Sequence, residues 1–437
     1  MIPLAWTEIE ALGLGELRGA PADGVVRAIH DDSRAAGPGD LFVALNTGTR
    51  FVEDALAAGA STLVPRDQEA ALAALASLVR GRSDAQVVAV VGSTGKTTTK
   101  DVLGALCVTS TPTVAADASR NNELGLPLTV LRLESETRVL VTEMGMRGVG
   151  QVAELCRIAR PTLSLVTSIG PEHLELVGTV DDVARANAEA IVALPTGGTA
   201  VIPADEPLLE SYLRDDLRVR RFDPALLERI ALDESLTLTG RSHWSRWLFP
   251  IGGSRLPLVV PFSHRHLVHN VLAALTAYHA LGLPLDAVQG SLLRVSFSAW
   301  RGEVHSLPGG GLVVNDAYNA NPTSMRAALL DLSERAEGRR RVAILGGMAE
   351  LGAESGRYHE EIASLLAELG VEVVVAVGEE ARAYLASAPE SHHAADADAV
   401  AHLLDVLAPG DAILVKASRA VGLEGIPALI EKHGRAW

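Results

Sequence analysis

A strand-like run that leads directly into a glycine-rich loop constrains the fold more than any other feature of the chain. Residues 87–91 read Val-Val-Ala-Val-Val, a short β-branched run typical of a buried parallel strand. The loop follows at once, and its glycines, Gly92 and Gly95, let the backbone curl so that successive N–H groups converge on a phosphate. A helix beginning after the loop would add its positive N-terminal end.

The loop sequence predicts the ligand as well as the fold. In such loops the lysine, here Lys96, neutralises the outer phosphates, and the hydroxyl after it, here Thr97, binds Mg²⁺. Only two residues separate the glycines, fewer than in the usual G-x-x-x-x-G-K-[ST]. A glycine turn that happens to precede a basic helix is the alternative, but the position between a strand and a helix favours a phosphate loop. We therefore expect ATP and Mg²⁺ as cofactors, with the nucleotide bound by Gly92, Ser93, Thr94, Gly95, Lys96, Thr97 and Thr98.

Similar apolar runs recur along the chain and are separated by stretches with helical periodicity. They lie at 139–142, 163–166, 312–314, 342–345, 373–377 and 412–415. This alternation predicts an α/β fold of parallel sheets covered by helices. Turn-rich breaks near 81–84 and 308–311 divide the chain into three domains. We expect a small N-terminal α/β domain at 1–82, a central parallel-sheet ATPase domain at 83–305 and a C-terminal Rossmann-like α/β domain at 306–437.

Charge and cysteine content narrow the setting. A net charge of -16 argues against bulk affinity for nucleic acid or an anionic membrane. No apolar run approaches the ~18 residues that a membrane span needs, and the first twenty residues, with three glutamates, make a poor secretory signal. Two cysteines are too few for a disulfide framework and fit a reducing compartment. A cytoplasmic protein is expected.

A carboxylate follows the second predicted strand. Glu143 comes directly after the run at 139–142, at the strand end where parallel sheets place metal and phosphate ligands. A strand-end glutamate is more often simply solvated. Beside a phosphate loop, the metal role is the better interpretation.

The shortened loop resembles that of the Mur ligases and their folylpolyglutamate synthase relatives, and the resemblance extends from about residue 30 to about 425. It implies that Glu143 binds Mg²⁺ at the triphosphate and that His173 binds a second Mg²⁺. It also implies that Asn121 and Asn122, in an N-N-x-x-G-x-P segment, lie near the γ-phosphate and bind substrate. A lone histidine is more often structural, and an Asn-rich turn is the simpler alternative for residues 121–127.

One position departs from the family pattern. The family carries a lysine in an A-K-x-E run, which CO₂ converts to a carbamate, whereas this chain has Ala186-Asn187-Ala188-Glu189. An amide cannot be carbamylated and brings no negative charge. Asn187 could still accept a hydrogen bond or reach a metal through water.

The resemblance also assigns the nucleoside contacts. Asn270, in His266-Leu267-Val268-His269-Asn270, matches the asparagine that hydrogen-bonds adenine. Arg301 matches an arginine at the hinge into the last domain that contacts the nucleotide, and Asp316 matches the residue that meets the ribose in the closed form.

The loop at 315–325 indicates the branch of the family. Its N-D-x-Y-N-A-N-P pattern is typical of the enzymes that add D-alanyl-D-alanine, and it implies that Asn319, Asn321 and Ser324 bind substrate. Lys416 and Arg419, in a V-K-x-S-R run, suit a substrate carboxylate or an acyl phosphate.

The N-terminal domain carries a further part of the resemblance. Asp32-Ser33-Arg34, followed by Pro38-Gly39-Asp40-Leu41-Phe42, is similar to the segment that holds the UDP end of the precursor, which makes Ser33 and Arg34 substrate-binding candidates. The loop at 46–51 is shorter than in the family and lacks its histidine.

Taken together, the resemblance implies an ATP-dependent amide-bond ligase. It would add D-Ala-D-Ala to UDP-N-acetylmuramoyl-tripeptide through an acyl phosphate, as a monomer, with Lys96, His173, Lys416 and Arg419 as catalytic residues. The short loop at 46–51 and Asn187 keep two alternatives open. One is a ligase of the same type with a different substrate, and the other is a non-catalytic nucleotide- or precursor-binding paralogue.

Overall fold

The computed structural model describes residues 1–232, 244–262 and 265–434. The chain forms two compact units, and each is described by itself. The first comprises the described parts of Met1–Ser168, Arg185–Ser263 and His269–Ser296. The second comprises those of Ile169–Ala184, His264–Val268 and Phe297–Trp437.

The N-terminal part of the first unit is a small α/β layer. Its four-stranded sheet has the order β2-β6-β5-β4, in which β4, β5 and β6 are parallel and β2 is antiparallel to β6. Strands β1 and β3, from the same part of the chain, form a separate two-stranded antiparallel sheet. The elements are β1 Leu4–Ala5, α1 Trp6–Ala11, β2 Gly15–Arg18, β3 Val25–Val26, β4 Ala28–His30, β5 Asp40–Val43, α2 Val52–Ala57, β6 Ser61–Pro65 and α3 Gln68–Arg80.

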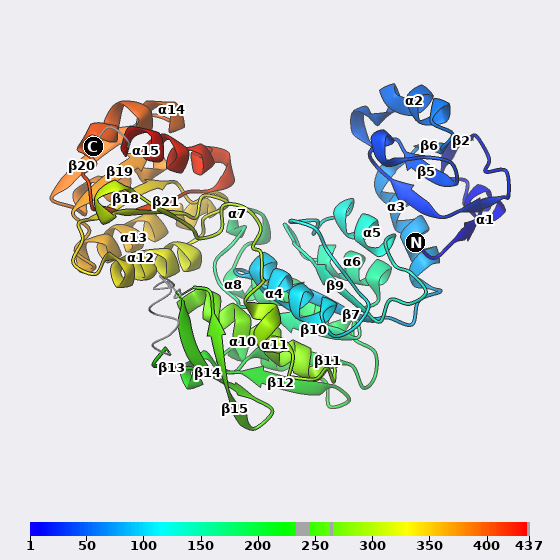
Figure 1. Cartoon of the computed structure of the whole chain (residues 1–437), viewed down its shortest axis with the longest axis horizontal. Coiled ribbons are helices and arrows are strands. Elements are labelled where there is room, and N and C mark those ends of the chain that lie inside the picture. The colour runs from blue at the N-terminus through cyan, green and yellow to red at the C-terminus, as the bar shows by residue number, and fades with distance from the viewer. Residues whose placement is uncertain (233–243, 263–264, 435–437) are drawn as a thin grey trace. The chain divides into compact units, whose positions relative to one another are not determined.

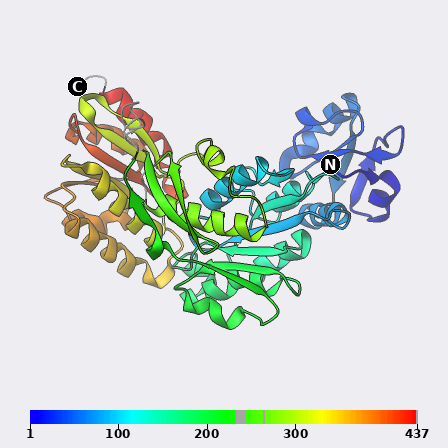
Figure 2. The same cartoon turned by 60° about the horizontal axis from the view of Figure 1, so that its bottom comes forward.

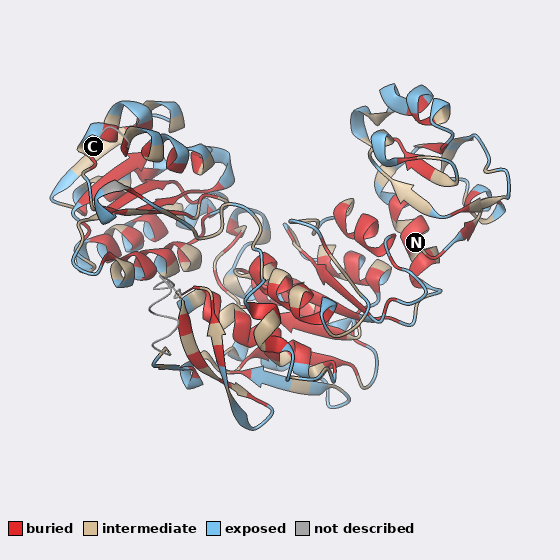
Figure 3. Ribbon diagram, viewed as in Figure 1, coloured by how far each residue is buried: buried red, intermediate tan, exposed pale blue. Residues whose placement is uncertain are grey.

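The centre of the first unit is a six-stranded, fully parallel sheet with the order β12-β11-β10-β7-β9-β8 (Figures 1 and 2). The strands are β7 Gln86–Val91, β8 Thr113–Ala115, β9 Val139–Glu143, β10 Leu163–Val166, β11 Thr199–Pro203 and β12 Arg218–Phe222. Strands β7, β9, β10 and β11 are almost wholly buried, which is why their sequences are continuous apolar runs rather than alternating ones (Figure 3).

Strand order fixes where a ligand can bind. The chain leaves β7 toward β8 on one side of the sheet, and it leaves β10 toward β11 on the other. A crevice forms at the carboxyl ends of adjacent strands whose connections diverge in this way. The loops that follow β7 and β10 therefore meet at one edge.

Helices cover the sheet. α4 contacts β7, β8 and β9 and packs with α11, while α5 and α6 contact each other and α3. The helices are α4 Lys96–Val108, α5 Gly125–Val130, α6 Gln151–Ala159, α8 Val180–Val192, α10 Arg265–Ala280 and α11 Val288–Leu292. A three-stranded antiparallel sheet completes the unit, with β13 Glu228–Ile230, β14 Ser245–Ile251 and β15 Ser254–Val260.

The second unit contains another six-stranded sheet, with the order β16-β17-β21-β18-β19-β20. Only β16 is antiparallel, at one edge. Val313, Ile344, Val375 and Ile413, one from each of four strands, lie in its buried core. The elements are α7 Leu174–Val177, β16 Glu303–Ser306, β17 Leu312–Asn315, α12 Pro322–Ala336, β18 Arg341–Gly346, α13 Ser355–Glu368, β19 Val373–Val377, β20 Glu390–Ala394, α14 Ala397–Val400, β21 Ala412–Lys416 and α15 Ile426–Gly434.

The predicted fold class is confirmed. Every apolar run singled out in the sequence is a strand of one of the two large sheets, with ends that differ by a residue at most. The exact limits of the three domains stay a prediction. In the described part of the chain, no helix is both long and apolar enough to cross a membrane.

Candidate active site

The loop after β7 is held in a conformation that only glycine adopts readily. Gly92 has φ 124°, and a Cβ at this position would lie 2.3 Å from Thr167 Oγ1. Thr167 follows β10, so the crowding comes from the neighbouring strand end. Both the backbone angle and the lack of space therefore explain the glycine that begins the loop.

The loop amides divide into two groups. Those of residues 92–94 donate to the protein itself. Gly92 N donates to Asn187 Oδ1 at 2.7 Å, Ser93 N to Ser168 O at 2.8 Å, and Thr94 N to Ser168 Oγ at 3.1 Å.

The next amides belong to the first turn of α4, which has no intrahelical partner for them. In the described part of the chain, the N–H groups of Gly95, Thr97 and Thr98 have no hydrogen-bond partner. Together with the positive end of the thirteen-residue helix, they form an anion-binding site. Of the seven loop residues predicted to bind nucleotide, Gly95, Thr97 and Thr98 thus offer free backbone donors.

Two further predicted residues lie on the loop. The Lys96 ammonium folds back onto the carbonyl oxygen of Gly92 and lies 3.5 Å from that of Ser93. Asn270, near the start of α10, packs against Gly95 so closely that a Cβ there would lie 2.4 Å from its Oδ1. The structure therefore brings Asn270 to the phosphate loop, although the two are 175 residues apart in the sequence.

Glu143 ends β9 and is 1% exposed. Its Oε1 accepts a hydrogen bond of 2.8 Å from Asn121 Nδ2. Its Oε2 is buried without a hydrogen-bond partner in the described part of the chain. A buried, unpaired carboxylate oxygen is costly, so this atom fits a bound cation.

The asparagine segment at 121–122 is firmly fixed. Asn121 O accepts from Gly145 N at 2.8 Å, and Asn122 Oδ1 accepts from Gly125 N at 2.9 Å, at the start of α5. Both predicted substrate residues thus also shape the loop beside Glu143.

In the second unit, three predicted residues meet at the carboxyl ends of adjacent parallel strands. Lys416 ends β21 and Asp316 follows β17. Lys416 Nζ donates to Asp316 Oδ2 at 2.6 Å and to Asn319 O at 2.8 Å, and the lysine side chain is only 2% exposed.

Asn321 and Ser324 begin helix α12. Asn321 Oδ1 accepts from Ser324 N at 2.8 Å, and Ser324 Oγ accepts from Asn321 N at 3.0 Å. This reciprocal pair is a capping box, so both side chains fix the start of the helix. Their predicted substrate contacts stay a prediction.

Arginines of the second unit stack on aromatic rings. The Arg301 guanidinium lies 3.9 Å from the ring centroid of Tyr318, and its Nε is buried without a partner among the described residues. Arg419 lies 4.5 Å from the ring centroid of Trp300 and pairs with Glu424 at 2.9 Å.

Two histidines of the second unit are held by neighbouring groups. His173 Nδ1 contacts the carboxylate of Glu350, a residue that the sequence did not single out for it. His359 is 2% exposed, with Nε2 accepting from Met348 N at 3.0 Å and Nδ1 donating to Ser355 O at 2.7 Å. Both of its ring nitrogens are therefore occupied by the backbone.

Ser33 and Arg34 lie in a short turn of the N-terminal layer. Asp32 caps this turn, and its carboxylate accepts three side-chain hydrogen bonds from Arg34, at 2.9, 3.2 and 2.6 Å. This pairing lowers the pKa of Asp32 to about 2. Arg34 is 88% exposed, so its outer face is open to solvent.

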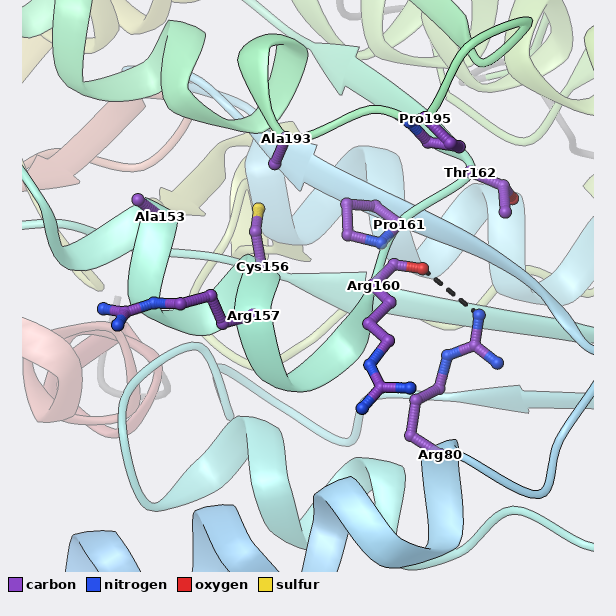
Figure 4. A pocket seen from close by; sticks show the side chains of 9 residues that line it. All are labelled: Arg80, Ala153, Cys156, Arg157, Arg160, Pro161, Thr162, Ala193 and Pro195. Carbon is purple, nitrogen blue, oxygen red and sulfur yellow. Dashed lines mark hydrogen bonds between the residues drawn. The ribbon is translucent and has the colours of Figure 1, made fainter.

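A cavity of about 530 Å³ lies at the amino ends of β10 and β11 (Figure 4). The phosphate loop lies at the other end of the central sheet, where the parallel strands have their carboxyl ends. Arg80 donates to Ala159 O at 2.7 Å and to Arg160 O at 3.2 Å beside the cavity, and so joins the end of α3 to the end of α6. None of the predicted site residues lines this cavity.

The fold and the loop geometry define a phosphate-loop α/β protein with a Rossmann-like C-terminal domain. The chain belongs to the Mur ligase family. Residues 90–278 match the Mur ligase middle domain, and residues 300–419 match the Mur ligase, glutamate ligase domain.

Relatives cover nearly the whole chain. The UDP-N-acetylmuramoyl-tripeptide–D-alanyl-D-alanine ligase of Escherichia coli is 31% identical over 99% of this chain and 100% of its own length. That of Bacillus subtilis is 31% identical over 92% of each chain. Among solved structures, MurF from Acinetobacter baumannii superposes with a TM-score of 0.84 at 26% identity, covering 98% of this chain and 99% of its own. MurF from Thermotoga maritima in complex with ADP superposes with a TM-score of 0.79 at 26% identity, covering 94% of this chain and 98% of its own.

Proposed function

We propose that this protein is an ATP-dependent ligase that joins D-alanyl-D-alanine to UDP-N-acetylmuramoyl-tripeptide in peptidoglycan precursor synthesis. The observation that carries the proposal is the end of the adjacent parallel strands β7 and β9: the loop after β7 has free amides at 95, 97 and 98, and β9 ends in Glu143 with its unpaired carboxylate oxygen. Full-length similarity to ligases of this activity supports it.

The nucleotide would be ATP. Its outer phosphates are bound by the free amides of the loop, and Lys96 leaves the Gly92 carbonyl to pair with them. Asn270 would hydrogen-bond adenine, Arg301 would contact the nucleotide, and Asp316 would bind the ribose.

Magnesium fits the residues present. Thr97, 1% exposed in the first turn of α4, and Glu143 supply the hydroxyl and carboxylate oxygens that Mg²⁺ prefers. Among the described residues, no group of three or more His, Cys, Asp and Glu side chains is arranged to hold a metal ion, so phosphate and water oxygens would complete the coordination. When bound, the ion neutralises charge that develops on the phosphates. His173 is proposed for a second ion.

The reaction is two displacements. A carboxylate oxygen of the tripeptide forms a bond to the γ-phosphorus, and the bond from that phosphorus to the bridging oxygen of ADP breaks. The amine of D-Ala-D-Ala then attacks the acyl carbon, phosphate leaves, and the amine proton passes to water. Lys96, Lys416 and Arg419 offset the negative charge of the transferring group, since positioning and electrostatics dominate phosphoryl transfer.

The remaining predicted residues hold the two substrates. Ser33 and Arg34 serve the UDP end of the precursor, while Asn121, Asn122, Asn319, Asn321 and Ser324 line the path of its peptide and of the dipeptide. We further propose that the enzyme is a cytoplasmic monomer, in agreement with two free, buried cysteines.

Mass spectrometry of the product tests the substrate assignment. Incubation with ATP, Mg²⁺, UDP-N-acetylmuramoyl-tripeptide and D-Ala-D-Ala should yield the pentapeptide precursor. Single amino acids offered in place of the dipeptide should yield no product. Transfer of a single amino acid in preference to the dipeptide would instead support a ligase of the same type with a different substrate, the alternative that the short loop at 46–51 favours.

A further inference from the structure

Asn187 lies on α8 at the position where an A-K-x-E pattern would place a lysine, and it faces the phosphate loop. Its side chain is 1% exposed, and Oδ1 accepts the hydrogen bond of 2.7 Å from Gly92 N. We propose that Asn187 is a positioning residue for the phosphate loop, which acts by holding the Gly92 amide rather than by binding a metal ion. The inference rests on the proposed function, because it assigns the loop to a nucleotide.

Helix α8 holds two neighbouring loops with two side chains. Asn187 reaches the loop after β7, and Glu189 reaches the segment after β9. Oε1 of Glu189 accepts from Gly150 N at 2.6 Å and Oε2 accepts from Ala153 N at 2.9 Å, at the start of α6. Residues 187 and 189 thus fix the backbone on both sides of the strand pair β7–β9, whose ends carry the phosphate loop and Glu143.

The bond from Gly92 decides which way the loop faces. Gly92 is buried at φ 124°, and the amides of residues 92–94 are all directed into the protein, toward Asn187 and Ser168. A buried N–H without an acceptor is unfavourable, so the loop would rotate to find one if Oδ1 were removed. Rotation at 92 carries the free amides at 95, 97 and 98 away from the phosphate.

Two substitutions of Asn187 distinguish a role in positioning the loop from a role in binding a metal ion. Asn187→Leu keeps the size of the side chain and removes the acceptor, whereas Asn187→Asp keeps an acceptor at the same place. Amide hydrogen exchange of Gly92 in the nucleotide-free protein reports the bond directly. ADP affinity, measured by calorimetry with Mg²⁺ and again in excess chelator, reports its consequence.

We expect Gly92 in Asn187→Leu to exchange at least about tenfold faster than in the parent, and Asn187→Asp to retain protection. The dissociation constant of ADP for Asn187→Leu should rise by about tenfold, and by the same factor with and without Mg²⁺. Leu72→Ala, which removes buried apolar volume from α3, serves as the stability control. It should lower the melting temperature and leave ADP affinity unchanged.

Three outcomes would overturn the inference. Unchanged Gly92 exchange in Asn187→Leu is one, and loss of protection in a folded Asn187→Asp is another, which still decides the matter if the leucine variant does not fold. The third is weaker ADP binding confined to the Mg²⁺ condition, which would indicate a metal ligand. Failure of the parent protein to bind ADP at all would count against the proposed function instead, while the exchange experiment would still test Asn187.

Discussion

Lys416 donates a hydrogen bond of 2.6 Å from Nζ to Oδ2 of Asp316, across two adjacent parallel strands of the second unit. The resemblance implied different roles for the two residues: Asp316 would meet the ribose, and Lys416 would bind a substrate carboxylate or the acyl phosphate. Their direct pairing means that the position of each depends on the other. It also fixes the loop that follows Asp316, because the same ammonium holds the carbonyl of Asn319.

Replacement of Lys416 by methionine should therefore affect stability and activity together. Methionine fills the space but leaves the Asp316 carboxylate and the Asn319 carbonyl without their donor. We expect the free energy of unfolding to fall by about 2 kcal/mol and phosphate release to fall at least about 100-fold. Urea denaturation and a phosphate-release assay measure the two effects. A stable variant with parental turnover would show that Lys416 has no part in the reaction.

Substitution of Gly92 by alanine should abolish nucleotide binding. The added Cβ would meet Thr167 Oγ1 at 2.3 Å, and the φ of 124° is unfavourable for any L-residue. We predict that ADP affinity falls at least about 100-fold, since a shift of the loop misplaces its free amides. Gly356→Ala is the matched control, because it lies in α13 at an ordinary φ with open space for a Cβ and should retain full affinity. Equal affinities for the two variants would contradict the loop geometry.

Glu143→Gln tests the metal site. Glutamine can keep the contact with Asn121 and nearly the same volume, but it brings no negative charge to the buried position of Oε2. The Mg²⁺ concentration for half-maximal phosphate release should rise at least about tenfold, with little change in melting temperature. An unchanged Mg²⁺ requirement would remove Glu143 from the metal site.

The two cysteines should be chemically silent in the native protein. Burial raises the pKa of both Cys107 and Cys156 to about 12, from an ordinary value of 9.0. At pH 8 the thiols are therefore protonated and inaccessible, and iodoacetamide should modify them only after denaturation. Because the folded-state pKa values are raised, the stability that the buried thiols contribute is complete below pH 9 and decreases as pH rises from about 9 toward 12. Rapid alkylation of the native protein at pH 8 would refute this assignment.

Activity should not depend on dissolved CO₂. The amide of Asn187 cannot form a carbamate, and its oxygen already accepts the hydrogen bond from Gly92. Phosphate release should therefore change by less than about twofold between buffer stripped of CO₂ and buffer containing bicarbonate. Strong activation by bicarbonate would mean that another group in the site is carbamylated.

Local patterns made most of the fold predictable. The buried strands are continuous β-branched runs, and the phosphate loop is a contiguous motif, so neither depends on knowing what packs against them. Glu143 was likewise predictable as a metal ligand, because it directly follows an apolar run and so lies at the carboxyl end of a predicted parallel strand. Its neighbour Asn121 was found through resemblance, and the structure brings the two together.

Contacts between residues far apart in the chain could not be predicted from the sequence. Ser168 accepts a hydrogen bond from Thr94, 74 residues earlier in the chain, and Asn187 accepts one from Gly92, 95 residues earlier. No rule of sequence spacing connects these pairs. Polar residues also have more than one possible use. Asn321 and Ser324 are engaged in capping α12, and His359 bonds the backbone, roles that depend on local geometry rather than residue type.

Phosphate release from ATP, measured with each of the two other substrates separately and with both together, decides whether the protein is this ligase. We predict release that requires UDP-N-acetylmuramoyl-tripeptide and D-Ala-D-Ala together, and that disappears in Lys96→Ala. If ADP binds measurably but no combination of these substrates releases phosphate, the protein is not this ligase.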